Sequence, residues 1–138
     1  MIGARPTARP ANRESRRLTL PSDLSVTCLC ADWCGTCRDY VAAFEGLGAR
    51  YADTPFTWYD VEDDADVVGD LDIETFPTLL IRRAGHVVYL GPVLPDPAHA
   101  QRLIETYAEM PADEAVRYAT ATEERRAWQD LCDFEDAR

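Results

Sequence analysis

Ala31-Asp32-Trp33-Cys34-Gly35-Thr36-Cys37 is the stretch that decides the fold, because it joins two different hydrophobic patterns. Before it, residues 26–31 form a continuous apolar run of strand length, typical of a central strand covered on both faces. After it, apolar side chains recur at three- and four-residue spacing, which predicts a helix over residues 34–50. The residues with this helical spacing are Tyr40, Val41, Phe44, Leu47 and Tyr51.

The two cysteines of this stretch have the spacing of a dithiol that exchanges disulfides. A helix that begins at Cys34 places its sulfur near unpaired backbone N–H groups and the positive end of the helix dipole. Both favour the thiolate, which is the nucleophile in disulfide exchange. Cys37 follows one turn later, close enough to attack a mixed disulfide on Cys34 and release the partner. Half of a zinc site has the same Cys-x-x-Cys spacing, so the motif alone leaves metal binding open.

Length and composition narrow the class of protein. A chain of 138 residues predicts one domain with a small appendage. Five cysteines, four of them within residues 28–37, do not resemble the disulfide framework of a secreted protein. The net charge of −11 argues against nucleic acid and anionic membranes as partners. We therefore expect a cytoplasmic protein, in which an exposed Cys-x-x-Cys motif is redox-active or metal-binding more often than structural.

The chain divides into three predicted parts. Residues 1–20 are rich in arginine and proline and are expected to be flexible, although a basic docking arm or an amphipathic helix over residues 12–20 remains open. Ser15-Arg16-Arg17-Leu18 superficially resembles a twin-arginine export signal, but no apolar segment follows it. Residues 21–110 form the predicted domain, and residues 111–138 form a C-terminal helical extension.

Downstream of the motif, the pattern predicts an open α/β sheet with helices on both faces. A strand at residues 56–61 precedes a short helix near residues 66–71, and strands at 78–82 and 87–90 flank a hairpin turn. Asp96 is expected to cap a further helix with Pro97 in its first turn. In the extension, Thr120 and Glu123 have capping-box spacing. The apolar stripe that follows them (Ala127, Trp128, Leu131, Cys132) is expected to fold back onto the domain; a dimer or partner contact and a solvated tail are the alternatives.

Three separated features together resemble the thioredoxin family over about residues 24–108. The first is the run from Ala31 to Cys37, the second is Phe76-Pro77-Thr78-Leu79, and the third is Gly91 after the last strand. The resemblance implies a thioredoxin-like fold: a mixed four- or five-stranded sheet with helices on both faces, here followed by the C-terminal helical extension. It also implies a cis bond between Phe76 and Pro77, which turns this backbone toward the dithiol.

The same resemblance implies a thiol–disulfide oxidoreductase that reduces protein disulfides. Cys34 would be the nucleophile and Cys37 the resolving cysteine of a redox-active Cys34–Cys37 disulfide, with no metal and no other cofactor. The implied partners are protein disulfides and an electron donor such as a thioredoxin reductase, with the chain a monomer or weak dimer. The residues implied to contact the substrate are Trp33, Gly35, Thr36, Phe76, Pro77 and Gly91.

Several positions depart from the family pattern. Cys28 stands where the family usually has a buried aspartate, Trp58 where a lysine often accompanies it, and Cys30 where it has a tryptophan. Thr36 replaces the common proline, and a Cys28–Cys30 bond also remains open.

These departures keep other interpretations open. One is a thioredoxin-fold binding or scaffolding module with little turnover, and another is a metal site made of Cys28, Cys30, Cys34 and Cys37. Trp33 could instead be a core aromatic residue. Cys132 is expected to be a buried structural thiol, although a regulatory disulfide remains open, and His86 and His99 are expected to face solvent.

Overall fold

The computed structural model describes residues 20–31, 33–69, 71 and 73–132. Expectations for residues 1–19 therefore lie outside the described part. The strands are β1 (Leu24–Cys30), β2 (Phe56–Asp60), β3 (Thr78–Arg83) and β4 (His86–Pro92). The helices are α2 (Gly35–Arg50), α3 (Ala65–Val68), α4 (Pro97–Ala108), α5 (Ala112–Ala119) and α6 (Glu123–Leu131). No helix among these residues is long and apolar enough to span a bilayer.

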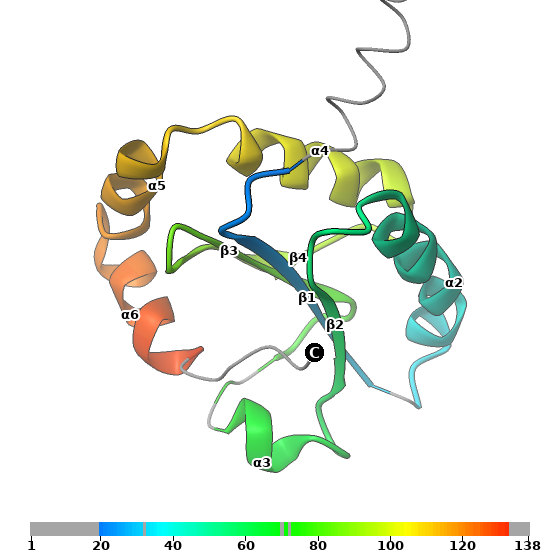
Figure 1. Cartoon of the computed structure of the whole chain (residues 1–138). Helices are drawn as coiled ribbons and strands as arrows, with labels where there is room; N and C mark the ends of the chain where they lie inside the picture. The colour runs from blue at the N-terminus through cyan, green and yellow to red at the C-terminus, as the bar shows by residue number, and fades with distance from the viewer. Residues whose placement is uncertain (1–19, 32, 70, 72, 133–138) are drawn as a thin grey trace, which may run out of the picture.

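The four strands form one mixed sheet in the order β2-β1-β3-β4 (Figure 1). β1 runs parallel to β2 and antiparallel to β3, and β3 runs antiparallel to β4. β1 therefore lies in the interior of the sheet, which explains its continuous apolar sequence. The predicted mixed α/β architecture is confirmed, and the four-stranded alternative describes the sheet.

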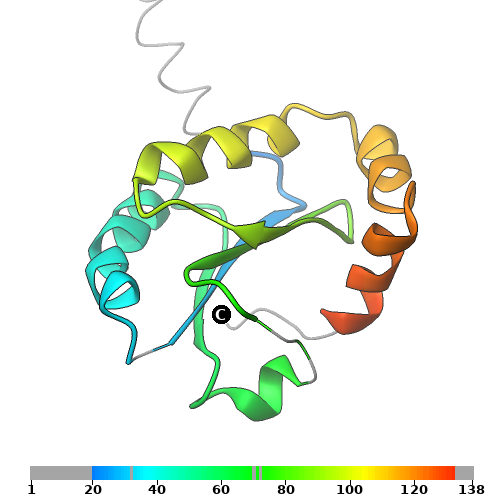
Figure 2. The ribbon, with the colours of Figure 1, turned by 180° about the vertical axis from the view of Figure 1, so that it is seen from behind.

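Helices cover both faces of this sheet (Figures 1 and 2). Val26, Cys28 and Cys30 of β1 belong to a core cluster that also contains buried residues of α2, α4 and α5. Leu29 points to the opposite face, where it packs with Tyr59 of β2 and Val68 of α3. This alternation follows from the pleat of the strand, which turns successive side chains to opposite faces.

Local signals in the sequence account for several of the element boundaries. The Asp96 carboxylate accepts a hydrogen bond from the Ala98 N–H at 3.0 Å, and Pro97 occupies the first turn of α4. The β3–β4 hairpin turns through Ala84 and Gly85, whose φ angles are +56° and +77°. Positive φ at both turn residues is the pattern of a tight hairpin turn.

Within its described part, residues 111–132, the C-terminal extension forms two helices, and their capping differs from the sequence expectation. Thr122, not Thr120, is the N-cap of α6, and its hydroxyl accepts a hydrogen bond from the Arg125 N–H at 3.1 Å. The Thr120 hydroxyl instead donates to the Val116 carbonyl at 2.9 Å, at the end of α5. The spacing of Thr120 and Glu123 was misleading because the chain ends one helix there before it begins the next.

The extension packs on the sheet, as predicted. At the edge strand β4, the Gln129 side chain accepts from the Val87 N–H at 2.8 Å and donates to the Val87 carbonyl at 3.0 Å. Cys132 is buried in a cluster with Leu80 and Val87, against which Trp128 packs. The extension thus satisfies part of the open edge of the sheet, which would otherwise expose unpaired backbone groups.

Candidate functional site

The first cysteine of the motif lies at the start of α2. Cys34 is the N-cap residue with extended backbone angles (φ −87°, ψ 123°), and its carbonyl accepts from the Arg38 N–H at 3.1 Å. Its thiol is free and half-buried. Cys34, the predicted nucleophile, therefore has partial access to solvent at the N-terminus of a long helix.

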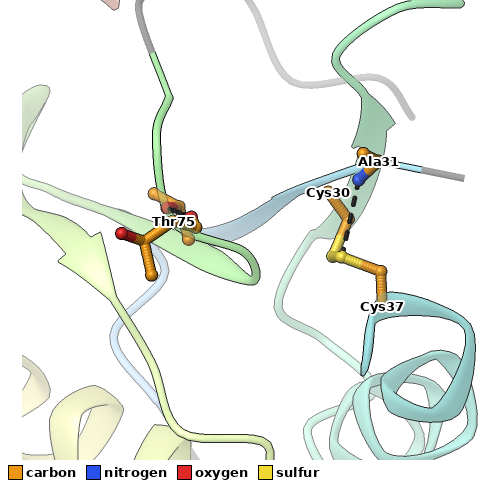
Figure 3. Close-up of a disulfide and its surroundings, with 5 residues drawn as sticks. Cys30, Ala31, Cys37 and Thr75 are labelled. Carbon is orange, nitrogen blue, oxygen red and sulfur yellow. Dashed lines mark hydrogen bonds between the residues drawn. A yellow bond between two sulfur atoms is a disulfide. The ribbon is translucent and has the colours of Figure 1, made fainter. Parts of the chain in front are cut away.

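The second cysteine of the motif points inward and is bonded to a different residue from the one expected. Cys37 is 1% exposed and forms a disulfide with Cys30, which is fully buried; their Cα atoms are 5.8 Å apart. Figure 3 shows this bond between the end of β1 and the first turn of α2. The expected Cys34–Cys37 disulfide is therefore not the pairing in the structure.

The backbone at the end of β1 explains why Cys30 is within reach of Cys37. The Cys30 carbonyl accepts from the Val61 N–H at 2.8 Å, which holds this last residue of β1 against the chain that follows β2. The next residue, Ala31, donates its N–H to the Cys37 sulfur at 3.4 Å (Figure 3). The pleat directs the Cys30 side chain toward the face that α2 covers, where Cys37 of the first helical turn lies. The alternation of Val26, Cys28 and Cys30 was the sequence signal for this contact.

The segment before β3 carries the predicted cis bond. The Phe76–Pro77 peptide is cis, Pro77 is buried, and the Pro77 carbonyl accepts from the Val93 N–H at 3.1 Å. The close-up of the disulfide also draws Thr75 of this segment (Figure 3).

An aromatic pair connects this segment to the cysteine motif. The rings of Trp33 and Phe76 meet edge to face with centroids 5.6 Å apart. Trp33 is 61% exposed, so it is not a core residue, and its indole N–H donates to Glu62 at 3.1 Å. The structure thus brings the sequence-predicted Trp33 and Phe76 together as an apolar rim beside Cys34.

Of the other predicted substrate-contact positions, Gly35 and Thr36 lie on the surface of α2, whereas Gly91 lies within the sheet. Gly35 and Thr36 are exposed in the first turn of α2, and a Cβ at Gly35 would lie 3.8 Å from the Arg38 side chain. Gly91 pairs with Leu79 across β3 and β4, and a Cβ there would meet the Tyr89 hydroxyl at 3.1 Å. Gly91 therefore accommodates Tyr89, a residue that the sequence analysis did not single out.

The interior beneath the site contains no charged partner at the position of the family aspartate. Cys28 is fully buried there, and burial raises the pKa of its thiol far above the usual range. Burial, followed by nearby Cys28 and Asp96, also raises the pKa of Tyr40. In the described part of the chain, the Tyr40 hydroxyl has no hydrogen-bond partner. This arrangement favours neutral groups below the disulfide.

Metal ligation was the other interpretation of the cysteines. Within the described ranges, no group of three or more His, Cys, Asp or Glu side chains is placed to hold a metal ion. His86 and His99 are half-buried rather than solvent-facing: His86 Nδ1 lies 3.0 Å from the Ala84 carbonyl, and His99 Nδ1 accepts from the Leu94 N–H at 2.9 Å. Both histidines bind local backbone because they lie at a hairpin turn and at the start of α4.

Together, the fold and the site define a class: an α/β protein with a Cys-x-x-Cys motif at a helix N-terminus and a cis-proline segment nearby. The family model described as Thioredoxin matches residues 15–93. The chain belongs to the thioredoxin family.

Two proteins with similar sequences are also thioredoxins by name. The chain is 34% identical to Thioredoxin H2-2 of Oryza sativa subsp. japonica over 68 residues, which are 49% of this chain and 51% of the relative. It is 31% identical to Thioredoxin-2 of Saccharomyces cerevisiae over 58 residues, 42% of this chain and 56% of the relative. The chain therefore spans about half the length of the curated relatives that it matches.

Solved structures share the fold. A mutant thioredoxin from Halobacterium salinarum NRC-1 aligns with a TM-score of 0.55 and 28% identity, covering 64% of this chain and 78% of that one. Thioredoxin NaTrxh from Nicotiana alata aligns with a TM-score of 0.56 and 24% identity, covering 74% of this chain and 87% of that one. The thioredoxin-like fold is thereby established.

Proposed function

We propose that this chain is a thiol–disulfide oxidoreductase that reduces protein disulfides through Cys34 and Cys37. The observation that carries the proposal is the free, half-buried Cys34 thiol at the N-terminus of α2, beside the Trp33–Phe76 rim. Membership of the thioredoxin family supports the same chemistry. The proposed location is the cytoplasm, with a reductase as electron donor and no cofactor beyond the cysteines.

The reaction has two exchange steps. The Cys34 thiolate attacks one sulfur of the substrate disulfide, and a mixed disulfide forms while the other substrate sulfur leaves as a thiolate. The Cys37 thiolate, once its bond to Cys30 has been reduced, attacks the Cys34 sulfur and releases the second substrate thiol. Two electrons pass from the protein to the substrate, and a Cys34–Cys37 disulfide remains.

The proposed substrate surface surrounds Cys34. Trp33 and Phe76 provide an apolar contact, while the Phe76–Pro77 backbone offers hydrogen-bonding groups to an extended peptide. Gly35, Thr36 and Gly91 are proposed to line the remainder. Because Pro77 has no backbone N–H, it offers no competing donor to the thiolates.

A test compares insulin reduction by wild type and Cys34→Ser, with dithiothreitol as the electron donor. We expect Cys34→Ser to fall to the rate of dithiothreitol alone, because a serine hydroxyl does not exchange with disulfides. Cys132→Ser is the matched control, since Cys132 is a buried thiol beside α6, and it should retain the wild-type rate. Equal rates for wild type and Cys34→Ser would contradict the proposal.

A binding or scaffolding role is the second candidate, and the Cys30–Cys37 bond favours it. While Cys37 is bonded to Cys30, no resolving thiol is available at Cys34. The chain would then hold a substrate as a mixed disulfide instead of releasing it. Complete single-turnover exchange with negligible recycling by a reductase would favour this role, and sustained turnover driven by a reductase would exclude it.

A further inference from the structure

Cys37 lies within bonding reach of two cysteines, Cys30 at the end of β1 and Cys34 at the start of its own helix. Its bond to Cys30 joins Cα atoms 5.8 Å apart, within the roughly 4.4–6.8 Å usual for disulfides. Cys34 precedes Cys37 by three residues at the start of the same helix, and side chains with this spacing are neighbours, about 5–6 Å apart at Cβ. One sulfur can therefore form a bond to the strand or to the helix N-terminus, but not to both at once.

We propose that Cys30 is a third redox-active cysteine. It competes with Cys34 for the disulfide bond to Cys37. This inference rests on the proposed function, because the Cys34–Cys37 disulfide that enters the exchange is the product of that reaction. Cys30 would thereby convert a disulfide that includes the half-buried Cys34 into a fully buried one after each turnover.

The exchange conserves atoms and electrons. The Cys30 thiolate attacks the Cys37 sulfur, the Cys34–Cys37 bond breaks, and the Cys30–Cys37 bond forms. Cys34 leaves as a thiolate and takes up the proton that Cys30 lost. The chain stays oxidised by two electrons throughout, so no external oxidant or reductant takes part in this step.

The two oxidised forms differ in what they expose. With Cys30 bonded to Cys37, both bonded sulfurs belong to residues that are 0% and 1% exposed, and the half-buried Cys34 is left as a free thiol. Direct attack by a reductant on that bond requires local opening of the structure. Cys34 offers the alternative route, because its attack on Cys37 regenerates the Cys34–Cys37 disulfide, in which a reductant can reach the half-buried Cys34 sulfur.

The sequence permits a direct test of the pairing. The wild-type chain is oxidised, quenched with acid, alkylated under denaturing conditions and digested with a protease that cleaves before aspartate. Asp23, Asp32 and Asp39 then separate peptide 23–31, which contains Cys28 and Cys30, from peptide 32–38, which contains Cys34 and Cys37. A Cys30–Cys37 bond links the two peptides, whereas a Cys34–Cys37 bond lies within one.

We expect the linked peptides with alkylated Cys34 as the main oxidised form of wild type. Cys30→Ala should abolish the linked pair and the alkylation of Cys34, leaving the bond within peptide 32–38. Cys28→Ala is the matched control, because Cys28 lies two residues earlier on the same face of β1 and is equally buried. It should leave the linked pair and the alkylation of Cys34 unchanged.

A kinetic measurement tests the role of Cys34. Reduction of the Cys30–Cys37 bond by dithiothreitol should be at least about tenfold slower in Cys34→Ser than in wild type, because only the route through local opening remains. Equal rates would overturn the exchange. So would oxidised wild type that contains only the bond within peptide 32–38, with Cys30 alkylated.

These results are separable from failure of the proposed function. Peptide mapping and the reduction rate need no protein substrate, so they report on the pairing even if insulin is not reduced. A chain that reduces insulin but never forms the linked peptides would overturn this inference alone.

Discussion

A single residue at the end of β1 changes the disulfide chemistry of this site. Cys30 stands where the family has a tryptophan, and its side chain points to the first turn of α2. There it is bonded to Cys37, so Cys34, the proposed nucleophile, keeps a free thiol. Gly91 is a second position where a single side chain matters, because a Cβ added there would meet the Tyr89 hydroxyl.

We expect Gly91→Ala to destabilise the protein by about 1 kcal/mol. The added Cβ would meet the Tyr89 hydroxyl at 3.1 Å and ring carbon Cζ at 3.3 Å. Tyr89 cannot retreat freely, because its hydroxyl donates to the Pro92 carbonyl at 2.7 Å and its ring packs near Tyr107. The overpacking cost should exceed the roughly 0.4–1 kcal/mol that alanine gains by restricting the unfolded chain. Urea unfolding monitored by circular dichroism measures the difference.

The control for Gly91→Ala is the same substitution in a Tyr89→Phe background. Removing the hydroxyl takes away the nearest atom, so Gly91→Ala should cost less there, and a double-mutant cycle gives the coupling. An equal cost in both backgrounds would show that Tyr89 is not the obstacle.

At the level of elements, three of the described helices begin at features that can be recognised in the local sequence. α2 starts directly after Cys34, at the junction of the two hydrophobic patterns, and α4 starts at Asp96. α6 starts at Thr122. These boundaries place Cys34 at an N-cap position and orient Cys37 toward β1.

Thr122→Ala should destabilise α6 by about 1 kcal/mol, because it removes the acceptor for the Arg125 N–H. Thr120→Ala is the matched control: Thr120 is two residues away and exposed, and its hydroxyl donates to the last turn of α5 instead. Hydrogen exchange of the α6 amides should accelerate in Thr122→Ala and not in Thr120→Ala. A larger effect of Thr120→Ala would restore the capping predicted from the sequence spacing.

In the whole molecule, the C-terminal helices complete the core of the sheet. Ala115 and Ala119 of α5 join the same buried cluster as Cys30 and Cys37. On the other face, α6 brings Cys132 against Leu80 and Val87, and Arg82 donates to the Cys132 carbonyl at 2.8 Å. The extension thus contributes to both layers around the sheet.

Because the docked extension buries the Cys132 thiol, we expect the protein to lose stability at alkaline pH. Burial raises the pKa of the Cys132 thiol to about 11, partly offset by Arg82, whereas an exposed thiol titrates near roughly 8.5. The folded state therefore favours the neutral thiol. This contribution is complete below about pH 8.5 and is lost as the pH rises to about 11.

Unfolding of wild type and Cys132→Ser across this pH range, under anaerobic conditions, measures the contribution of Cys132. The free energy of unfolding should fall more steeply with pH in wild type, because serine does not titrate there. The slope is the readout, since the substitution itself also changes packing. Parallel slopes would show that Cys132 titrates alike in the folded and unfolded chain.

Much of the fold could be predicted from local sequence, because several elements are specified by residues that are close together along the chain. The apolar run of β1, the helical spacing of α2 and the Asp96 cap of α4 depend on neighbours along the chain. The candidate site depended in addition on the resemblance of the motif and Phe76-Pro77 to the thioredoxin family. Thr120 failed as a cap because α5 ends at that residue, and the second threonine, Thr122, caps α6 instead.

The sequence by itself determined the α/β class and the position of Cys34 at a helix N-terminus, and its resemblance to the thioredoxin family pointed to the cis-proline segment. Only the tertiary structure decided that Cys37 bonds to Cys30, that Trp33 packs on Phe76 and that Gly91 adjoins Tyr89. The physical reason is that these contacts depend on how far the strand and helix surfaces are separated in space. Periodicity shows which way a side chain points, whereas its partner is selected by the packing of the whole chain.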